Sequence, residues 1–154
     1  MATDDLSQLN ELFDGLIQQL SPAARKQLSR DISRRLRASQ AQRIKKNKAP
    51  DGSAFEARKP QPAWAKRLGA IKKKLMFQKI IRQKYFKAEH SPSAASVSFT
   101  GFISRVAVEH QYGLRGRVND SIKAQYPKRE LLGFTVDEQD MIEEVIVRHL
   151  AIMN

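Results

Sequence analysis

The side chains that most often perform catalysis or hold metal ions are few in this sequence, and their spacing suits neither task. The three histidines, His90, His110 and His149, never form a His-x-x-x-His pair, so a metal site would need all three from separate elements. Cysteine is absent, which excludes a disulfide framework, a thiolate zinc site and a cysteine nucleophile. We therefore expect structural or hydrogen-bonded histidines, no metal and no cofactor.

Phosphate-binding loops, dinucleotide fingerprints and nucleophile elbows are also missing. No Gly-x-x-x-x-Gly-Lys-Ser/Thr or Gly-x-Gly-x-x-Gly occurs, and no serine lies in an elbow motif. The nearest carboxylate cluster, Asp137, Glu138 and Asp140, lies where a helix is expected to begin, and capping and dipole effects explain acids there. We therefore do not expect an enzyme.

Charge is the strongest signal in the sequence. The chain has 154 residues, with 28 Lys and Arg against 16 Asp and Glu, and a net charge of +12. Residues 1–24 carry four acids and no base, residues 25–87 carry 21 bases and three acids, and residues 88–154 carry seven bases and nine acids. A basic middle therefore lies between two mildly acidic ends.

Two functions fit this basic middle. Its bases, interleaved with aromatic residues, could neutralise phosphates and stack on the bases of a nucleic acid. Alternatively, the aromatics belong to the core and the bases meet an acidic protein surface, where complementary charge speeds encounter and fixes register. Composition alone favours nucleic acid, whereas the positions of the aromatics favour packing: Phe55, Trp64, Phe77, Tyr85 and Phe86.

Length and composition predict one domain, or one domain with an extension. Apolar residues make up 41% of the chain, which is enough for a modest core. No apolar stretch approaches the roughly 18–20 residues that span a bilayer. The acidic N-terminus lacks the basic start and apolar run of a signal peptide. We expect a soluble protein that does not contact a membrane.

Apolar periodicity predicts a helical hairpin at the N-terminus. Leucine, isoleucine and phenylalanine recur at three- and four-residue steps over residues 4–20. Ser21-Pro22 combines a capping residue with proline at the first helical position, so a second helix follows over residues 22–44. We expect residues 1–48 to form this hairpin and residues 49–154 to form an α+β core domain.

The elements after the hairpin predict a helix-rich α+β fold. Pro50-Asp51-Gly52-Ser53 has strong turn chemistry within a loop over residues 47–62. A helical pattern over residues 63–80 predicts a third helix. Alternating patterns over residues 85–90 and 95–100 predict a small antiparallel sheet.

A short helix and a long C-terminal helix complete the expected fold. The short helix covers residues 102–110 and ends where Gly113 supplies a left-handed turn. Residues 114–130 show no clear period, which predicts mostly loop. Thr135 with Glu138 matches a capping box, so the last helix begins there and runs nearly to the C-terminus.

Several sequence blocks, taken in order, resemble one known family. They are residues 10–16, 20–25 and 34–44; Pro50-Asp51-Gly52-Ser53-x-Phe55 with Arg58-Lys59-Pro60; Lys74-Leu75-Met76-Phe77-x-Lys79; and residues 108–114 with Pro127-x-Arg129-Glu130-Leu131-Leu132-Gly133 and the C-terminal helix. This order resembles the tail-completion, or virion-morphogenesis, family of contractile-tailed bacteriophages, which includes Mu-like and related temperate phages. The likeness covers about residues 10–150.

The resemblance implies a structural virion protein without catalytic activity. Such proteins finish the tail at its head-proximal end and make it competent to join the DNA-filled head. They are expected as a ring, commonly of six copies, on the end of the tail tube or sheath. In such rings the N-terminal helices often reach the neighbouring subunit, so the resemblance implies that the hairpin of residues 1–48 is an assembly arm. Their partners are neck or connector proteins, and genomic DNA passes transiently. The protein is then assembled in the host cytoplasm and located in the virion. Two alternatives stay open: a small basic nucleic-acid-binding protein, and a neck or connector protein on the head side.

Charge and resemblance together nominate two sets of residues. Contacts with other virion proteins are expected from Arg34, Arg35, Arg37, Lys72, Lys73, Lys74 and Arg129. For Arg129 two readings stay open, a pair with a buried or inter-subunit carboxylate and an exposed loop base. Structural roles are expected for Pro50, Asp51, Gly52, Trp64, His110, Gln111, Tyr112, Gly113, Leu131, Leu132 and Gly133.

Overall fold

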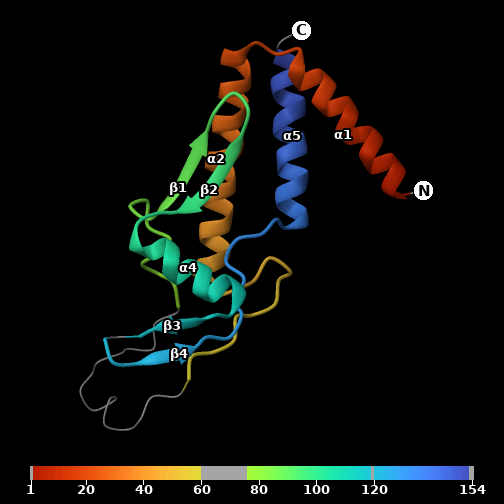
Figure 1. The fold of residues 1–154 in the computed structure, drawn as a ribbon. Helices are drawn as coiled ribbons and strands as arrows, with labels where there is room; N and C mark the ends of the chain where they lie inside the picture. The colour runs from red at the N-terminus through yellow and green to blue at the C-terminus, as the bar shows by residue number, and fades with distance from the viewer. Residues whose placement is uncertain (1, 60–75, 119, 153–154) are drawn as a thin grey trace. The chain divides into compact units, whose positions relative to one another are not determined.

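The computed structural model describes residues 2–59, 76–118 and 120–152 (Figure 1). Its elements follow one another in the order α1 (Ala2–Gln18), α2 (Pro22–Lys45), β1 (Phe86–His90), β2 (Ala95–Phe99), α4 (Phe102–Tyr112), β3 (Arg115–Arg117), β4 (Lys123–Gln125) and α5 (Val136–Ile152). The strands form two sheets of two strands each, β1-β2 and β3-β4. These helices and small sheets confirm the expected α+β class.

The chain divides into two compact units. The first contains Met1–Leu36, Ala88–Val97 and Val136–Asn154, and the second contains Arg37–Lys87 and Ser98–Thr135. The C-terminal helix therefore belongs to the same unit as α1 and the part of α2 up to Leu36. The expected division at residue 48, between an assembly arm and a core domain, stays a prediction.

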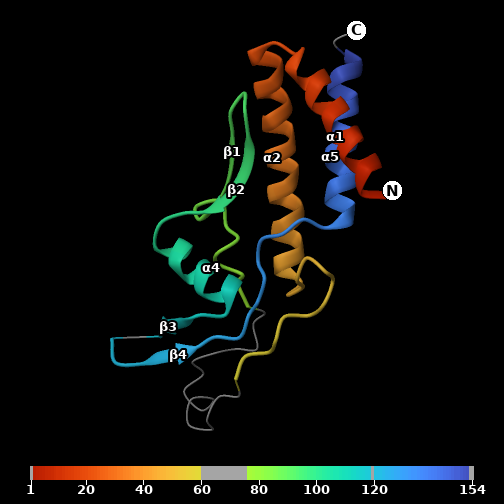
Figure 2. The same ribbon diagram turned by 45° about the vertical axis from the view of Figure 1, so that its right-hand side comes forward.

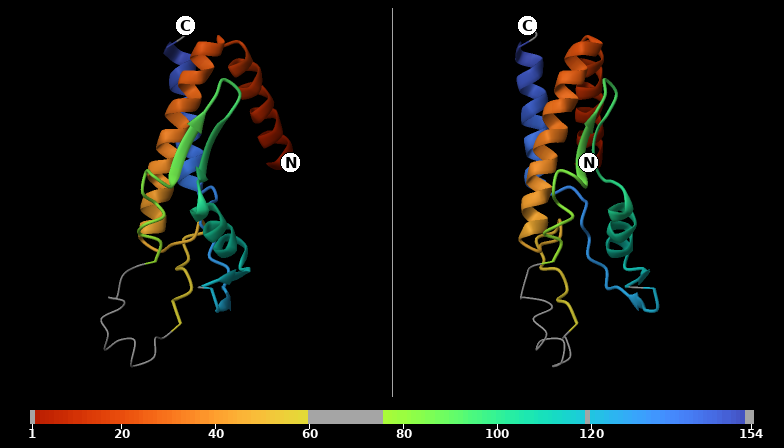
Figure 3. Two further views of the ribbon diagram at one scale, coloured as in Figure 1. Left: turned by 60° about the vertical axis from the view of Figure 1, so that its left-hand side comes forward. Right: turned by 90° about the vertical axis from the view of Figure 1, so that its left-hand side faces the viewer.

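The first unit is built on the hairpin and α5. The Ser21 hydroxyl accepts a hydrogen bond from the Ala24 amide at 3.1 Å, as expected of the residue that caps α2. Leu20, Leu28 and Val145 are buried together. Around them pack the partly buried Ile17, Ala24, Ile32, Met141, Ile146 and Leu150. Figures 2 and 3 show α5 running beside α2. Ile17 of α1 packs on the same cluster, so α2 is covered by both of the other helices of this unit.

The second unit has an aromatic core. Phe86 is fully buried and stacks on Phe99, with ring centroids 4.7 Å apart. Phe55 is also buried and meets the edge of Phe77 at 5.6 Å. These positions support the packing interpretation of the aromatic residues in the basic middle. Tyr85 is half-buried and meets the edge of Phe102, with ring centroids 6.0 Å apart. Trp64 lies outside the described residues.

The third helix, predicted over residues 63–80, is not observed at residues 76–80, the part of this range that the structure describes. Most of it lies outside the described residues, but residues 76–80 form turns, and Phe77 has a φ of +67°, which an α-helix excludes. A tertiary contact explains the difference. The Asn47 side chain accepts from the Met76 amide at 3.1 Å and donates to the Met76 carbonyl at 3.3 Å. These bonds replace those that a last helical turn would have made.

Residues 114–130 are mostly loop, as expected, but they also contain a second hairpin that the sequence did not predict. In the antiparallel β3-β4 pair, Arg115 faces Gln125, Gly116 faces Ala124, and Arg117 faces Lys123. Strands of three residues are too short for an alternating pattern to stand out.

Gly113 ends α4 as predicted. Its φ of 67° and ψ of 52° are left-handed, and its amide lies near the carbonyls of Glu109 and His110. A Cβ built there would meet the Lys128 amide nitrogen at 2.9 Å. Only glycine fits this position without strain.

Gly113→Ala is expected to lower the free energy of unfolding by about 2 kcal/mol, because it adds left-handed strain to a backbone clash. Gly15→Ala is the matched control. Gly15 lies inside α1 with nothing within 4 Å of its Cβ position, so alanine should stabilise that helix by about 0.5–1 kcal/mol. Urea unfolding of both variants checks the prediction, and equal effects would contradict it.

Candidate functional site

The bases of α2 separate into those that face solvent and those that face the protein. Lys26, Arg30 and Arg34 are exposed and follow one another at four-residue intervals, so they lie on one face of the helix. We call these three residues the basic stripe. In the part of the chain that the structure describes, no carboxylate forms an ion pair with any of them. The stripe is therefore a patch of uncompensated positive charge.

Arg35, beside the stripe, is part of a small charged network. Its Nε donates to Asp31 Oδ1 at 2.9 Å, and Asp31 Oδ2 lies 3.3 Å from His149 Nε2 of α5. Burial raises the pKa of Asp31, but hydrogen bonds from Arg35 and His149 outweigh it and hold that pKa below its ordinary value. Arg35 is thus exposed at the surface and also forms part of the contacts that join α2 to α5 in the first unit.

The Arg37 side chain is directed toward the protein and not toward solvent. Its Nε donates to the Phe86 carbonyl at 2.6 Å and its Nη2 to the Ile81 carbonyl at 3.2 Å, while its guanidinium lies 5.5 Å from the Phe86 ring centroid. Arg43, one and a half turns further on, similarly donates to the Leu131 carbonyl at 2.6 Å. Nothing in the sequence distinguishes these inward arginines from outward ones. Lys72, Lys73 and Lys74, the other expected docking bases, lie outside the described residues.

The turn at Pro50-Asp51-Gly52 has the predicted chemistry. Asp51 Oδ1 accepts from both the amide and the hydroxyl of Ser53, at 2.9 and 2.5 Å. These bonds hold the pKa of Asp51 below its ordinary value. Gly52 has a φ of +89°, which the turn requires. The turn directs the chain back so that the Phe55 amide donates to the Asn47 carbonyl at 2.8 Å.

Gln111 acts as a clamp on the segment that precedes α5. Its Oε1 accepts from the amides of Leu131 and Leu132, both at 2.8 Å, and its Nε2 donates to the Leu132 carbonyl at 2.9 Å. Leu131 is fully buried. A Cβ on Gly133 would meet Pro50 Cγ at 2.6 Å, so glycine permits the close approach of these two loops. Residues nominated from three separate stretches are therefore joined here. Tyr112, in contrast, is 66% exposed.

Arg129 is buried, with 5% of its surface exposed, so the reading of an exposed loop base is wrong. Its Nε donates to the Glu56 carbonyl at 2.7 Å, its Nη2 to the Ala57 carbonyl at 3.2 Å, and its Nη1 lies 3.3 Å from His110 Nδ1. Its amide also donates to the His110 carbonyl at 2.8 Å. These hydrogen-bond partners are carbonyl oxygens and an imidazole, while the nearby Glu56 carboxylate acts on Arg129 through its charge. The other reading, a pair with a buried or inter-subunit carboxylate, stays a prediction.

His110 lies between two aromatic rings. Its centroid is 4.9 Å from that of Phe77, edge to face, and 4.4 Å from that of Tyr126. Burial, and then the charges of Arg129 and Arg58, lower the pKa of His110 from 6.5 to about 4. The imidazole is therefore neutral at pH 7, and Nδ1 is the acceptor for Arg129, since a guanidinium can only donate.

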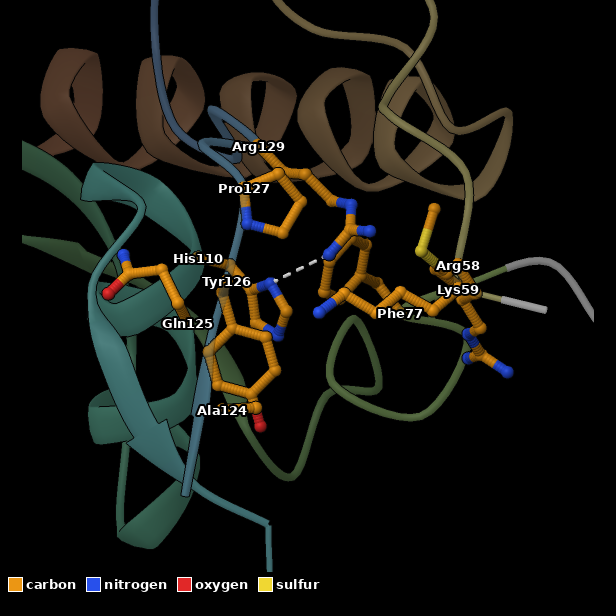
Figure 4. A pocket seen from close by; sticks show the side chains of 10 residues that line it. Arg58, Lys59, Phe77, His110, Ala124, Gln125, Tyr126, Pro127 and Arg129 are labelled. Atoms are coloured by element: carbon orange, nitrogen blue, oxygen red, sulfur yellow. Dashed lines mark hydrogen bonds between the residues drawn. The ribbon is translucent and has the colours of Figure 1, made fainter. Parts of the chain in front are cut away.

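These residues border a pocket of about 300 Å³ in the second unit (Figure 4). Figure 4 shows the Arg129 guanidinium directed toward His110, with the Tyr126 ring beside the imidazole. The pocket is lined by Arg58, Lys59, Met76, Phe77, His110, Ala124, Gln125, Tyr126, Pro127 and Arg129. Sequence reasoning singled out His110 and Arg129 but did not place them together, because only the turn at Gly113 and the β3-β4 hairpin bring residue 129 back to residue 110.

The lowered pKa of His110 predicts acid sensitivity. Between pH 6.5 and about 4 the unfolded chain binds a proton at residue 110 that the folded chain does not, so stability falls as the pH falls through this window. From pH 7 to pH 5 the free energy of unfolding should drop by about 1–2 kcal/mol from this group. Urea unfolding at both pH values tests this. His110→Gln should remove that part of the drop, and an unchanged drop would contradict the assignment.

Neither a metal site nor a membrane-spanning helix is present among the residues that the structure describes. There, no three His, Asp or Glu side chains are grouped as a metal ion would require. No helix in the same residues is long and apolar enough to cross a membrane.

Comparison with known proteins identifies the family. The model of the phage virion morphogenesis family matches residues 4–151. The chain is similar to tail completion protein S of Escherichia phage P2, with 40% identity over 149 residues, which cover 96% of this chain and 98% of the relative. No solved structure matches the chain. An alignment of this identity over nearly the full length of both proteins means that the chain belongs to the phage virion morphogenesis family.

Proposed function

We propose that this protein is a non-catalytic virion component that completes the phage tail at its head-proximal end and so lets the tail join the head. The observation that carries the proposal is the identity to tail completion protein S along nearly the whole of both chains. The alignment leaves no large segment of either chain unmatched.

The geometry of the nominated residues supports a structural role. The contacts of three nominated residues are made within the chain itself. Gln111 and Arg129 form hydrogen bonds with backbone groups, and Gly133 lies close to the loop at Pro50. His110 is neutral and packs against two aromatic rings, and the hydrogen-bond partner of its Nδ1 is the Arg129 guanidinium, whereas a general base is usually oriented by a carboxylate. Such residues fix the shape of a surface, which is what a docking protein needs.

The basic stripe supplies the docking charge in this proposal. Its three side chains are exposed and unpaired among the described residues, so an acidic end of the tail or neck would be steered to it and held in register. The alternative, nucleic-acid binding through stacking, is weakened because Phe55 and Phe86 are buried and cannot reach a base. We propose that copies assemble as a ring, with six expected from the family, and that the N-terminal hairpin is the assembly arm.

Electron microscopy of a lysate tests the proposal directly. The phage that encodes this chain would carry a stop codon early in the gene. We expect DNA-filled heads that are separate from tails, and overlong tails would place the protein as the terminator of tail growth. Tails of normal length that do not join heads would place it at a later completion step. Intact infectious particles would overturn the proposal.

A further inference from the structure

The pocket of the second unit carries a positive charge that its own walls do not neutralise. Three cationic side chains line it, Arg58, Lys59 and Arg129, and no carboxylate is among its lining residues. Its remaining walls are mainly apolar or aromatic, with Phe77 and Tyr126 as the largest surfaces. A volume of about 300 Å³ is at the small end of the range for ligand pockets.

The position of Arg129 makes an anionic ligand favourable. The guanidinium is already removed from water, and the bonds to the Glu56 and Ala57 carbonyls and to His110 use three of its five N–H groups. A charged acceptor would stabilise this buried cation more than a neutral one, since charge-assisted hydrogen bonds are about twice as strong as neutral ones. Burial, and then the charges of Arg129 and Arg58, lower the pKa of His110. Burial also lowers the pKa of Arg129; the nearby Glu56 carboxylate partly offsets this effect, and the charge of Arg58 adds to it.

We infer that this pocket binds an acidic segment of another virion protein, in which a carboxylate stands next to an aromatic or aliphatic side chain. The carboxylate would meet Arg129 and the exposed Arg58 and Lys59, and the apolar side chain would lie against Phe77 and Tyr126. The inference rests on the proposed function only in taking the source of the segment to be a virion protein.

Two other occupants fit the pocket less well. A nucleic-acid strand carries a phosphate at every nucleotide and is held by a groove of bases that follows it, whereas this is a single hollow with largely apolar walls. The chain's own residues 60–75, which connect Lys59 to Met76, contain five bases and no acid, so they cannot supply the anion.

Nuclear magnetic resonance of the isotope-labelled full chain tests the chemistry. The probe is N-acetyl-L-phenylalanine, which joins a carboxylate to an aromatic side chain, and the matched ligand is its uncharged amide. We expect saturable shifts at His110, at the backbone of residues 124–127 and at Arg129, and an affinity for the amide that is at least about tenfold lower. Equal affinity for both probes, or no saturable binding, would overturn the inference.

Variants at the rim separate the pocket from the general positive charge. Arg58→Gln with Lys59→Gln alters two exposed side chains and is expected to weaken binding of N-acetyl-L-phenylalanine about tenfold. Lys84→Gln with Lys87→Gln removes the same charge from exposed positions outside the lining and should change binding less than twofold. Equal weakening by both pairs would show that net charge is responsible and would overturn the inference.

Competition distinguishes the anion. Inorganic phosphate and an oligothymidylate would be added to the complex at physiological salt. Weak competition supports the carboxylate ligand, whereas an oligothymidylate that binds the same residues more tightly would replace it with nucleic acid and overturn the inference. The stop-codon experiment does not depend on the pocket, so failure of binding and failure of tail completion are separate results.

Discussion

Reversing two charges of the basic stripe, Arg30→Glu with Arg34→Glu, is expected to lower the yield of infectious phage by about a hundredfold or more while the subunit stays folded. Both side chains are exposed, so the change leaves the core of the first unit intact. Close charge pairs across an interface contribute about 1.5–7 kcal/mol, and reversal replaces attraction by repulsion. About 2.8 kcal/mol already corresponds to a hundredfold loss of affinity. The measurement is the titre when the variant complements a phage with an early stop codon in this gene.

Lys84→Glu with Lys87→Glu is the matched control. It changes the net charge by the same amount at exposed positions in the second unit and should leave the titre within about threefold of the wild type. Circular dichroism and urea unfolding must first show that both double variants fold. A folded stripe variant that complements normally would refute docking through the stripe. A control that fails equally would attribute the effect to overall charge.

The structure decides which arginines belong in this experiment. Arg37 was expected to dock, but its guanidinium holds the carbonyls of Ile81 and Phe86. Its charge reversal would leave those groups unpaired in the second unit, and a loss of function would then reflect misfolding. Arg35 is also unsuitable, since its removal breaks the contact with Asp31.

Gln111→Leu should have the largest effect on stability, lowering the free energy of unfolding by about 3 kcal/mol. The change removes three hydrogen bonds and leaves the amides of Leu131 and Leu132 without their acceptor. Partly buried backbone groups that lose a partner cost about 1–3 kcal/mol each, and relaxation toward water reduces the sum. Urea unfolding measures the change.

Two further variants check that the clamp is the cause. Gln125→Leu removes one exposed bond, from Nε2 to the Gly113 carbonyl at 2.7 Å, and should cost less than about 1 kcal/mol. Gln111→Glu keeps the acceptor for both amides and loses only the donor to the Leu132 carbonyl, so its stability should lie between those of the wild type and Gln111→Leu. If Gln111→Leu and Gln125→Leu are equally stable, residue 111 does not hold the 131–132 segment.

Several helix ends and the first strand pair could be predicted from the sequence, because residues close together in the chain specify them. Ser21-Pro22 starts α2, Gly113 ends α4, and the alternation around Ser91-Pro92-Ser93 produces β1 and β2, each from residues within a few positions of one another. The two missed features have different origins. Residues 76–80 depend on Asn47, a partner that is distant in sequence, and Asn47 binds Met76 in place of a helical turn. The β3-β4 pair is local, but its strands are too short to form an alternating pattern.

By itself the sequence determined the α+β class, the basic middle, the turn and cap residues and the resemblance to phage tail-completion proteins. Only the tertiary structure decided the direction of each charged side chain. Lys26, Arg30 and Arg34 face solvent, while Arg37 and Arg129 face backbone carbonyls that are 44 or more residues away along the chain. The physical reason is that a guanidinium finds carbonyl partners wherever folding places them, and residue type and helical spacing are the same for a docking arginine and a structural one.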